Sequence, residues 1–306
     1  MNTDALIIGL VWVTVAGSVW AMAGLIMALT ARRGVPPHHL IAISASVSII
    51  GASLVLIDHG ALATGRLPAR LGLLCGMLIS GGAMVSAGAQ SLMRAMRTGH
   101  QGTCWTIAQS AMIVPYCLGL VVWAAPHSWL RSAGVVLVLA ALVVFGTTRR
   151  GRGTSDGPDG GQAWLWFSLL TFACFGAQQF LATWPSTWAG WHDPVNIRPM
   201  LFYVGFGCAA WIPLLLQRQL PQRRTLPLGL LLGCGGVLGQ HALFTGLDQL
   251  EIVGLANTGF PIGVGISIAG FALLNRLIIR EPLNPRHHLG MALVLGGIVL
   301  LSGLLG

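Results

Sequence analysis

About ten long apolar segments, joined by short polar loops, constrain this chain more than any other feature of its sequence. A helix crosses the core of a bilayer with roughly 20 apolar residues. Segments of that kind fall at 5–30, 40–57, 70–93, 103–124, 130–147, 163–185, 199–216, 226–247, 252–278 and 288–305. Only 8% of the residues are charged and 55% are apolar, which is too few charges for the surface of a soluble protein. The sequence therefore predicts an all-α integral membrane protein with about ten transmembrane helices.

The basic residues lie singly or in small groups at the ends of these segments. All 17 are arginine. A nucleic-acid-binding face would show a continuous basic stripe with aromatic residues. The net charge of +9 is scattered instead, so we predict no nucleic-acid partner. The loops after the first, third, fifth, seventh and ninth segments contain Arg32, Arg33, Arg94, Arg97, Arg149, Arg150, Arg152, Arg218, Arg223, Arg224, Arg276, Arg280 and Arg286.

The remaining loops contain only Arg66, Arg70, Arg131 and Arg198. Positively charged loops are retained on the cytoplasmic side of a membrane. The uneven distribution predicts a multi-pass protein of the cell inner membrane, with both termini on the outer, non-cytoplasmic side.

A polar, glycine-rich stretch divides the chain into two halves. Residues 149–162 read as a cytoplasmic linker, with five apolar segments before it (1–148) and five after it (163–306). Because five is an odd number, the second half enters the membrane in the opposite orientation. Two inverted five-helix repeats are typical of secondary transporters.

Three pairs of positions support an internal repeat. The apolar run that begins at Gly134 resembles the run that begins at Gly290, 156 residues later. Gln90 corresponds to Gln240 at a spacing of 150, and Gln109 corresponds to Asn257 at a spacing of 148. The paired amides carry more weight than the apolar match, since apolar segments resemble one another by chance.

The second half resembles the drug/metabolite transporter (DMT) superfamily, in particular its EamA-type ten-helix permeases. The resemblance rests on the glycines from Leu232-Gly233 to Gly239, on Gly254-Leu-Ala-Asn-Thr-Gly-Phe-Pro261, on Ile279-Arg280-Glu281-Pro282-Leu283-Asn284, on His288-Leu-Gly290 and on the ending Gly296 to Gly303. The sequence departs from the family pattern at Arg280, where glycine is usual, and at Ala125-Pro126-His127, where an acidic turn is expected.

This resemblance implies a permease that moves a small polar metabolite by alternating access. The stretch from Cys104 to Tyr116 is also similar to the glucose/ribose and rhamnose uptake porters, so a sugar porter stays open as an alternative. A membrane scaffold or sensor that transports nothing is the alternative outside transport. The oligomeric state is left open between monomer and homodimer.

Polar and aromatic side chains inside the apolar segments are the candidates for a substrate site. An amide that faces lipid leaves its hydrogen-bonding groups unpaired, so each must face another helix or a wet cavity. In the resembled family, the third, fourth, sixth, eighth and ninth helices line the central cavity. The candidate binding residues are Trp105, Gln109, Gln178, Gln179, Tyr203, Gln240, His241 and Asn257.

Neutral amides and aromatic rings favour an uncharged or zwitterionic substrate. No arginine lies near the middle of a segment, where it could bind a phosphate in a bidentate way, although Arg198 near the outer end of one segment leaves this possible. For each amide, simple helix–helix hydrogen bonding is the competing interpretation. For His241, a neutral packed histidine competes with a protonation switch.

Two prolines and several spaced glycines are expected to shape the helices. Pro115 and Pro261 fall inside segments and can kink them, as helices at transporter sites often are. The pairs Gly229/Gly233, Gly235/Gly239 and Gly72/Gly76 have the spacing that permits close helix contact.

The sequence contains no pattern typical of an enzyme, a metal site or an ATP-driven pump. Glu281 falls in a loop, and Asp58 and Asp248 fall at segment ends, so no carboxylate is available for proton coupling in mid-membrane. The six cysteines lack CxxC spacing, and there is no GxxxxGK[ST] loop. We therefore predict no catalytic residue, no metal and no cofactor; the expected partners are the lipid bilayer and a small-molecule substrate.

Overall fold

The structure, a computed structural model, describes residues 3–68, 70–122, 128–147, 163–188, 193–253, 255–281 and 285–302. Within these residues the chain forms helices and connecting turns, and no strand. The first half comprises α1 (Thr3–Arg32), α2 (Pro37–Gly51) with a π-helical turn (Ala52–Leu56), the short α3 (His59–Ala63), α4 (Leu71–Thr98), α5 (Gln101–Gln109) with a 3₁₀ turn (Ser110–Met112), α6 (Ile113–Val122) and α7 (Trp129–Gly146).

The second half also consists mainly of long helices. It comprises α8 (Ala163–Thr183) with a 3₁₀ turn (Trp184–Thr187), α9 (Arg198–Leu216), a 3₁₀ turn (Arg223–Thr225), α10 (Leu226–Glu251), α11 (Ala256–Leu274) with a π-helical turn (Asn275–Ile279), and α12 (Pro285–Ser302).

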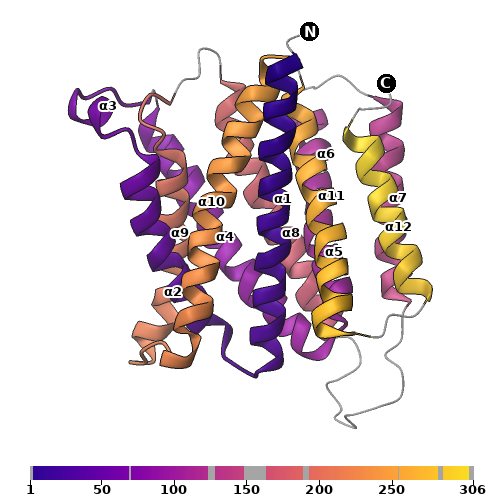
Figure 1. Cartoon of the computed structure of the whole chain (residues 1–306). Coiled ribbons are helices and arrows are strands. Elements are labelled where there is room, and N and C mark those ends of the chain that lie inside the picture. Colours follow the sequence, from indigo (N-terminus) through magenta and orange to yellow (C-terminus); the bar gives the residue numbers. More distant parts are fainter. Residues whose placement is uncertain are drawn as a thin grey trace.

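Eight helical segments of the described chain are long and apolar enough to cross a membrane. They are α1, α2 with its π-helical turn, α4, α5 continued by α6, α8, α9, α10 and α11. The predicted α-helical membrane protein is thus confirmed at this level. The other two predicted segments, 130–147 and 288–305, correspond to α7 and α12, which pack against each other at one edge of the bundle (Figure 1).

Three predicted boundaries were wrong by four or five residues. The segment predicted at 226–247 continues as helix to Glu251. The segment predicted at 70–93 continues as helix to Thr98, because helical hydrogen bonds persist through Arg94 and Arg97 after the apolar run has stopped. The segment predicted at 252–278 begins only at Ala256. The Leu255 N–H donates to Leu250 O at 2.8 Å. The residues before Ala256 therefore belong to the turn that ends α10, and α11 begins only after it.

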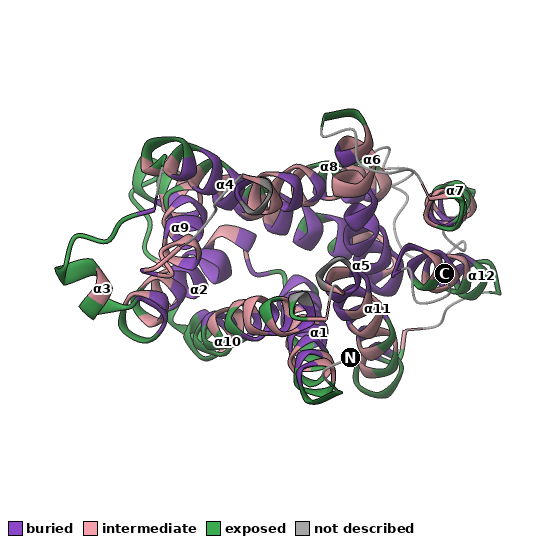
Figure 2. Cartoon of the chain, turned by 90° about the horizontal axis from the view of Figure 1, so that it is seen from above, coloured by how far each residue is buried: buried purple, intermediate pink, exposed green. Residues whose placement is uncertain are grey.

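Two ends of the bundle are distinguished below. The terminus end is where α1 begins, α3 lies, α9 begins and α10 ends (Figure 1). The linker end is where α1 and α4 end and where α5 and α10 begin, and Glu281 contacts the start of α5 there. Along the bundle axis, α4 and α8 lie along one side and α1 and α10 along the other (Figure 2). α2 and α9 connect these two layers at one side of the molecule, and α5 and α11 connect them at the other.

Glycines set the closest helix contacts. A Cβ at Gly229 would lie 2.5 Å from Ile43 Cγ2, and one at Gly233 would lie 2.7 Å from Ser44 O, so this pair brings α10 against α2 as its spacing predicts. The pair Gly72/Gly76 behaves differently. Both glycines are exposed on α4 and have no neighbouring atom within 4 Å of a built Cβ, so this spacing does not mark a contact within the chain.

Candidate functional site

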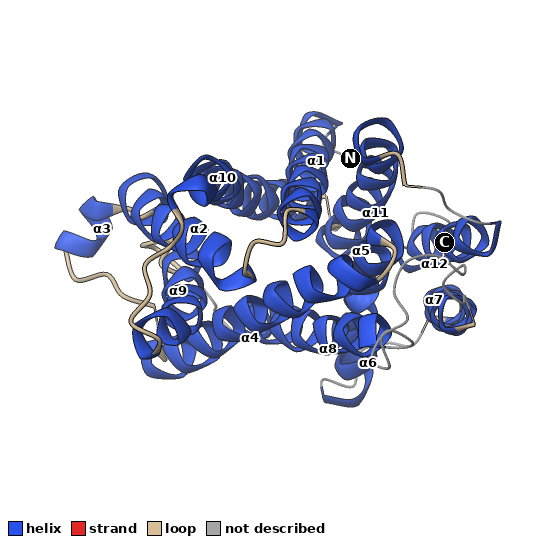
Figure 3. Ribbon diagram, turned by 90° about the horizontal axis from the view of Figure 1, so that it is seen from below, coloured by secondary structure: helices blue, strands red, loops and turns tan. Residues whose placement is uncertain are grey.

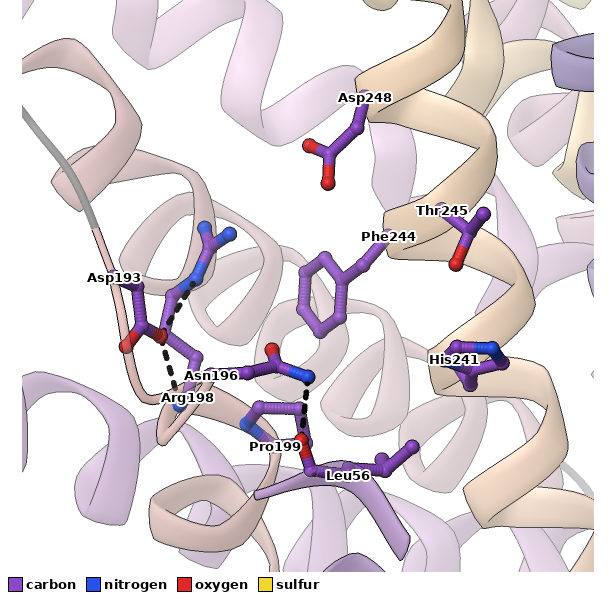
Figure 4. A pocket seen from close by; sticks show the side chains of 9 residues that line it. All are labelled: Leu56, Asp193, Asn196, Arg198, Pro199, His241, Phe244, Thr245 and Asp248. Carbon is purple, nitrogen blue, oxygen red and sulfur yellow. Dashed lines mark hydrogen bonds and ion pairs between the residues drawn. The ribbon is translucent and has the colours of Figure 1, made fainter. Parts of the chain in front are cut away.

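A polar pocket of about 460 Å³ opens at the terminus end of the bundle. Its walls come from the end of the π-helical turn after α2, the segment before α9, the first turn of α9 and the last turns of α10 (Figure 4). The lining residues are Leu56, Asp193, Asn196, Arg198, Pro199, His241, Phe244, Thr245 and Asp248.

The segment before α9 is held in place by hydrogen bonds to the first half of the chain. Asp193 caps α9, since its carboxylate accepts from the backbone N–H groups of Ile197 at 3.1 Å and Arg198 at 3.3 Å. The Asn196 amide donates to Leu56 O at 2.9 Å (Figure 4), and the Asp58 N–H donates to Val195 O at 2.9 Å. One wall of the pocket therefore joins the two halves.

Arg198 supplies a positive charge to this pocket. Its Nε lies 3.7 Å from Asp193 Oδ2, and the two side chains are 14% and 6% exposed. The guanidinium carbon also lies 4.8 Å from the centre of the Phe244 ring, close enough for a cation–π contact. Asp248 is within electrostatic range of Arg198 and projects toward the same space from α10 (Figure 4). A ligand here meets charges of both signs beside an aromatic ring.

The α10 wall follows from helical spacing. His241, Phe244, Thr245 and Asp248 stand at relative positions 0, 3, 4 and 7, so they share one face of the helix. His241 is exposed, and its ring meets Trp12 of α1 edge-on with centroids 5.7 Å apart. Of the predicted binding residues whose side chains the structure describes, His241 is the one that lines this pocket.

Trp105 and Tyr203 lie in the packed interior instead. Trp105 is 2% exposed, and its ring centroid lies 5.4 Å from that of Phe271 on α11. Its indole N–H has no hydrogen-bond partner among the described residues. Tyr203 is 4% exposed and lies on α9 with its hydroxyl close to Ser48 of α2.

The predicted amides are distributed over three helices. Gln109 is buried at the end of α5, and Gln178 is half-buried against Gly81 of α4. Gln179 is buried with no partner for its Oε1 among the described residues. Gln240 is half-buried on α10, and the side chain of Asn257 lies outside the described residues. The structure thus brings the predicted set into no single described pocket, and its role in binding stays a prediction.

The two predicted kink sites differ in local geometry. Pro115 follows the 3₁₀ turn Ser110–Met112 that separates α5 from α6. Its ring nitrogen has no hydrogen to donate to the preceding turn. α11 continues through Pro261 as one helix, and α9 contains a third internal proline, Pro213, that the prediction did not include.

At the linker end, Glu281 connects the second half to the start of α5. Its carboxylate accepts from the backbone N–H groups of Gln101 at 2.8 Å and Gly102 at 3.1 Å. It also accepts from the Asn275 amide at 2.7 Å and lies 3.3 Å from His100 Nδ1. The side chain is only 13% exposed. Glu281 lies outside a helix, as predicted, and its largely buried carboxylate caps the first turn of α5.

These hydrogen bonds determine the ionisation of Glu281. Burial alone would raise the pKa of this carboxyl. The hydrogen bonds from His100, Asn275 and the two backbone N–H groups outweigh burial and hold the pKa below its usual value of 4.5. The carboxylate is therefore charged at neutral pH and fixed between the two halves.

Further contacts close the same end. Arg32 at the end of α1 donates to Ile279 O at 3.1 Å, and the Gln101 amide donates to Ala28 O at 3.3 Å. The His100 and His287 rings lie 4.3 Å apart between centroids. Seen from the linker end, α5 lies beside α4 and α11 (Figure 3).

The sequence contained signals for residues that the candidate list lacks. Arg198 is an arginine in the arginine-poor set of loops, and Asp248 falls seven residues after His241 on the same helix. In the described residues, no group of three or more His, Cys, Asp or Glu side chains is placed to hold a metal ion.

Comparison with known proteins places the fold but not the activity. No known protein family and no curated protein matches the sequence. The chain is similar to a protein of known crystal structure that is 16% identical to it, with a TM-score of 0.60 over 98% of this chain and 96% of that one. At this identity the similarity speaks for a shared fold alone.

Proposed function

We propose that the protein is a secondary transporter of the cell inner membrane that moves a small polar metabolite by alternating access. In this proposal ten helices cross the membrane as two inverted repeats related to the EamA-type permeases. The observation that carries the proposal is the difference between the two ends of the bundle. A polar pocket opens at the terminus end, while hydrogen bonds from Arg32 to Ile279 and from the start of α5 to Glu281 join the halves at the linker end.

The packing of the helices supports two related halves. If α1, α2, α4, α5–α6 and α7 correspond in order to α8, α9, α10, α11 and α12, the main contacts occur as mirrored pairs. α1 packs on α10 as α8 packs on α4, and α4 packs on α9 as α10 packs on α2. α1 packs on α11 as α8 packs on α5 and α6. A two-fold relation between the halves accounts for these pairs.

One mirrored contact uses the same spacing as the sequence repeat. A Cβ at Gly134 of α7 would lie 3.0 Å from Leu301 Cγ of α12, and a Cβ at Gly290 of α12 would meet the Phe145 ring of α7. Gly290 follows Gly134 by 156 residues, and Leu301 follows Phe145 by the same 156. The positions that match in sequence therefore make matching contacts: Gly134 packs near Leu301, and Gly290 packs near Phe145. This agreement supports α7 and α12 as the fifth helix of each repeat.

The chemistry of the pocket supports an uncharged or zwitterionic substrate. Arg198 can pair with a negative group and Asp248 with a positive one, while Asn196 and Thr245 can form hydrogen bonds with neutral polar groups. The Asp193 carboxylate already pairs with Arg198, so a substrate with a large net negative charge gains less there than a neutral or zwitterionic one.

The distribution of arginine supports a cytoplasmic location for the linker end. Arg32, Arg33, Arg94, Arg97, Arg218, Arg223, Arg224, Arg276, Arg280 and Arg286 lie at the ends of helices that reach the linker end, whereas Arg66, Arg70, Arg131 and Arg198 lie at the terminus end. By the positive-inside rule the linker end is cytoplasmic. The pocket then faces outward.

The test is a thermal-shift screen of the purified protein against sugars, amino acids, nucleosides and cationic drugs, followed by flux into proteoliposomes. A ligand that binds the folded state raises its stability by about 2.7 kcal/mol at a hundred times its Kd. We expect one class to raise the melting temperature in a dose-dependent way and to accumulate by exchange against internal unlabelled ligand. Binding without flux would favour the sensor over the transporter.

Asp248→Asn ties that flux to the pocket. Because Asp248 is an exposed lining residue, the substitution should lower flux of the same probe and leave the melting temperature unchanged. Asp58→Asn is the matched control. Asp58 lies at the same end and caps α3 through Ala61, and asparagine caps a helix equally well. Equal flux in both variants would contradict the proposed site.

A further inference from the structure

A second cavity lies at the linker end, between residues of α2, α9, the turn before α10 and the start of α10. It measures about 320 Å³ and is lined by Ile43, Ser46, Val47, Trp211, Pro221, Gln222, Arg223, Leu226 and Leu230. α2 packs against both α9 and α10 (Figure 1). We refer to this cavity as the α2–α10 groove.

The wall of the α2–α10 groove offers an apolar surface. The Trp211 indole N–H donates to Ser46 Oγ at 3.0 Å, and the Ser46 hydroxyl donates to Ala42 O at 3.0 Å. Polar groups in the wall are thus paired inside the protein. Leu226 and Leu230 are 48% and 44% exposed, so the groove presents aliphatic surface to whatever lies alongside the helices.

The end of the groove is basic and held in place. Arg223 lines it, and the Arg224 Nε donates to Gln222 Oε1 at 2.7 Å. The Gln222 backbone N–H in turn donates to His39 Nδ1 at 2.9 Å, which ties this turn to α2. Among the described residues, no carboxylate forms an ion pair with either arginine. One exposed arginine therefore lines the end of an apolar groove, and a second exposed arginine is bonded to the lining residue Gln222 beside it.

We propose that the α2–α10 groove is a binding site for an anionic phospholipid. One acyl chain lies along Val47, Trp211 and Leu230, and the phosphate lies against Arg223 and Arg224. Complementary charge selects the lipid: a basic pocket between helices on the cytoplasmic side suits an anionic headgroup, whereas a choline headgroup would bring a cation toward the arginines. This site is separate from the polar pocket and does not depend on transport.

Native mass spectrometry of the full-length protein in detergent tests the proposal, with phosphatidylglycerol and phosphatidylcholine offered at equal concentration and with matched acyl chains. We expect preferential retention of phosphatidylglycerol. Arg223→Gln and Arg224→Gln should each lower that preference about five-fold, because an arginine near an anionic lipid surface contributes about 1 kcal/mol. Arg33→Gln changes an exposed arginine at the same end that does not line the groove and should leave the preference unchanged.

Two further experiments test the apolar groove and the phosphate group separately. Leu230→Trp places an indole in the groove and should reduce phosphatidylglycerol retention while both arginines remain. Inorganic phosphate, tested alone by thermal shift, should stabilise the protein far less than phosphatidylglycerol at the same concentration. Equal retention of the two lipids, an equal effect of Arg33→Gln, or equal stabilisation by phosphate would each overturn the proposal.

Discussion

At the scale of single residues, glycine determines how closely α4 and α9 can approach. A Cβ at Gly82 would meet the backbone carbonyl of Phe202, and a Cβ at Gly205 would meet the carbonyl of Ile79. Backbone atoms cannot move aside as the end of a side chain can. These two glycines therefore bring the helices together face to face, and neither belongs to a glycine pair that spacing alone had marked.

Gly82→Ala and Gly205→Ala should each destabilise the protein by about 2 kcal/mol or more, because the added methyl groups force the two helices apart. Thermal unfolding in detergent would measure the loss. Gly72→Ala and Gly76→Ala are matched controls on α4, with nothing within 4 Å of the added Cβ. They should be neutral or slightly stabilising, since alanine favours a helix over glycine. Similar losses at all four positions would contradict this account.

Glu281 should make stability depend on pH. Its pKa is lower in the folded protein than the usual 4.5, so the fold favours the charged form. That contribution is fully present above about pH 4.5 and is lost as the pH falls through the folded pKa. Glu281→Gln should cost about 1.5–3 kcal/mol at pH 7, the worth of hydrogen bonds to a charged group.

Melting temperatures of the two proteins at pH 7 and pH 3.5 would check this prediction. The difference between wild type and Glu281→Gln should be smaller at pH 3.5 than at pH 7, because protonation of the carboxyl removes part of the contribution below pH 4.5. Asp58→Asn, which changes an exposed cap at the other end, should show no such pattern. A difference that is the same at both pH values would mean that the Glu281 charge contributes nothing.

The paired amides Gln109 and Asn257 provide a test of the predicted binding set. Gln109→Ala and Asn257→Ala should reduce flux of the probe found in the screen while the protein stays folded, because an amide that binds substrate is not needed for helix packing. Melting temperature and proteoliposome flux would be measured together. If both variants keep full flux, the amides serve helix packing and the candidate set is wrong.

At the scale of elements, the break between α5 and α6 distinguishes the fourth segment from the other long helices. Ser110–Met112 forms a tighter turn, and Pro115 follows it. Proline removes one hydrogen bond and its ring crowds the preceding turn. In the proposed repeat its counterpart is α11, which continues through Pro261 without such a turn. In the proposed alternating-access mechanism, α5–α6 is therefore the member of this pair suited to bend.

Pro115→Ala should restore the missing hydrogen bond to Ala111 O and let the helix continue. We expect an equal or higher melting temperature and slower flux, because a straighter, stiffer helix hinders the change between states. Pro213→Ala, at an internal proline of α9, is the comparison. Unchanged flux in Pro115→Ala would show that the break is a packing detail.

At the scale of the whole molecule, the two termini should lie together on the outer side of the membrane, and residues 149–162 should lie on the cytoplasmic side. Alkaline phosphatase fused after Gly306 should be active, and green fluorescent protein at the same point should be dark, because the first needs the outer side and the second the cytoplasm. The same pair inserted at 153–157 should give the reverse result. A fluorescent C-terminal fusion would invert the orientation and place the polar pocket inside.

Much of the architecture follows from one-dimensional pattern. Apolar runs longer than a bilayer is thick must become helices, since no other structure satisfies the backbone of a single segment in lipid. The long helices of the described chain match the predicted segments within three residues, apart from the ends at Thr98, Glu251 and Ala256. These ends depend on hydrogen bonds, and hydropathy does not report them.

The candidate site was less predictable, for a physical reason. Residue type shows that an amide, an indole N–H or a tyrosine hydroxyl inside a helix needs a hydrogen-bond partner. It does not show which helix supplies that partner. Of the predicted set, His241 reaches the polar pocket, while Trp105 and Tyr203 pack in the interior. Helical spacing links His241 to Asp248, yet it gives no information about the opposite wall.

By itself, the sequence determined the helical membrane architecture and the segregation of arginine, and it predicts a division near 149–162, because each depends only on the order of apolar and charged residues. The tertiary structure decided which distant residues meet. Asn196 binds Leu56 across 140 positions, and Glu281 caps α5 across 180. Such contacts depend on how the helices pack in three dimensions, and glycine-mediated approaches set that packing within a few tenths of an ångström. No pattern along the chain encodes those distances.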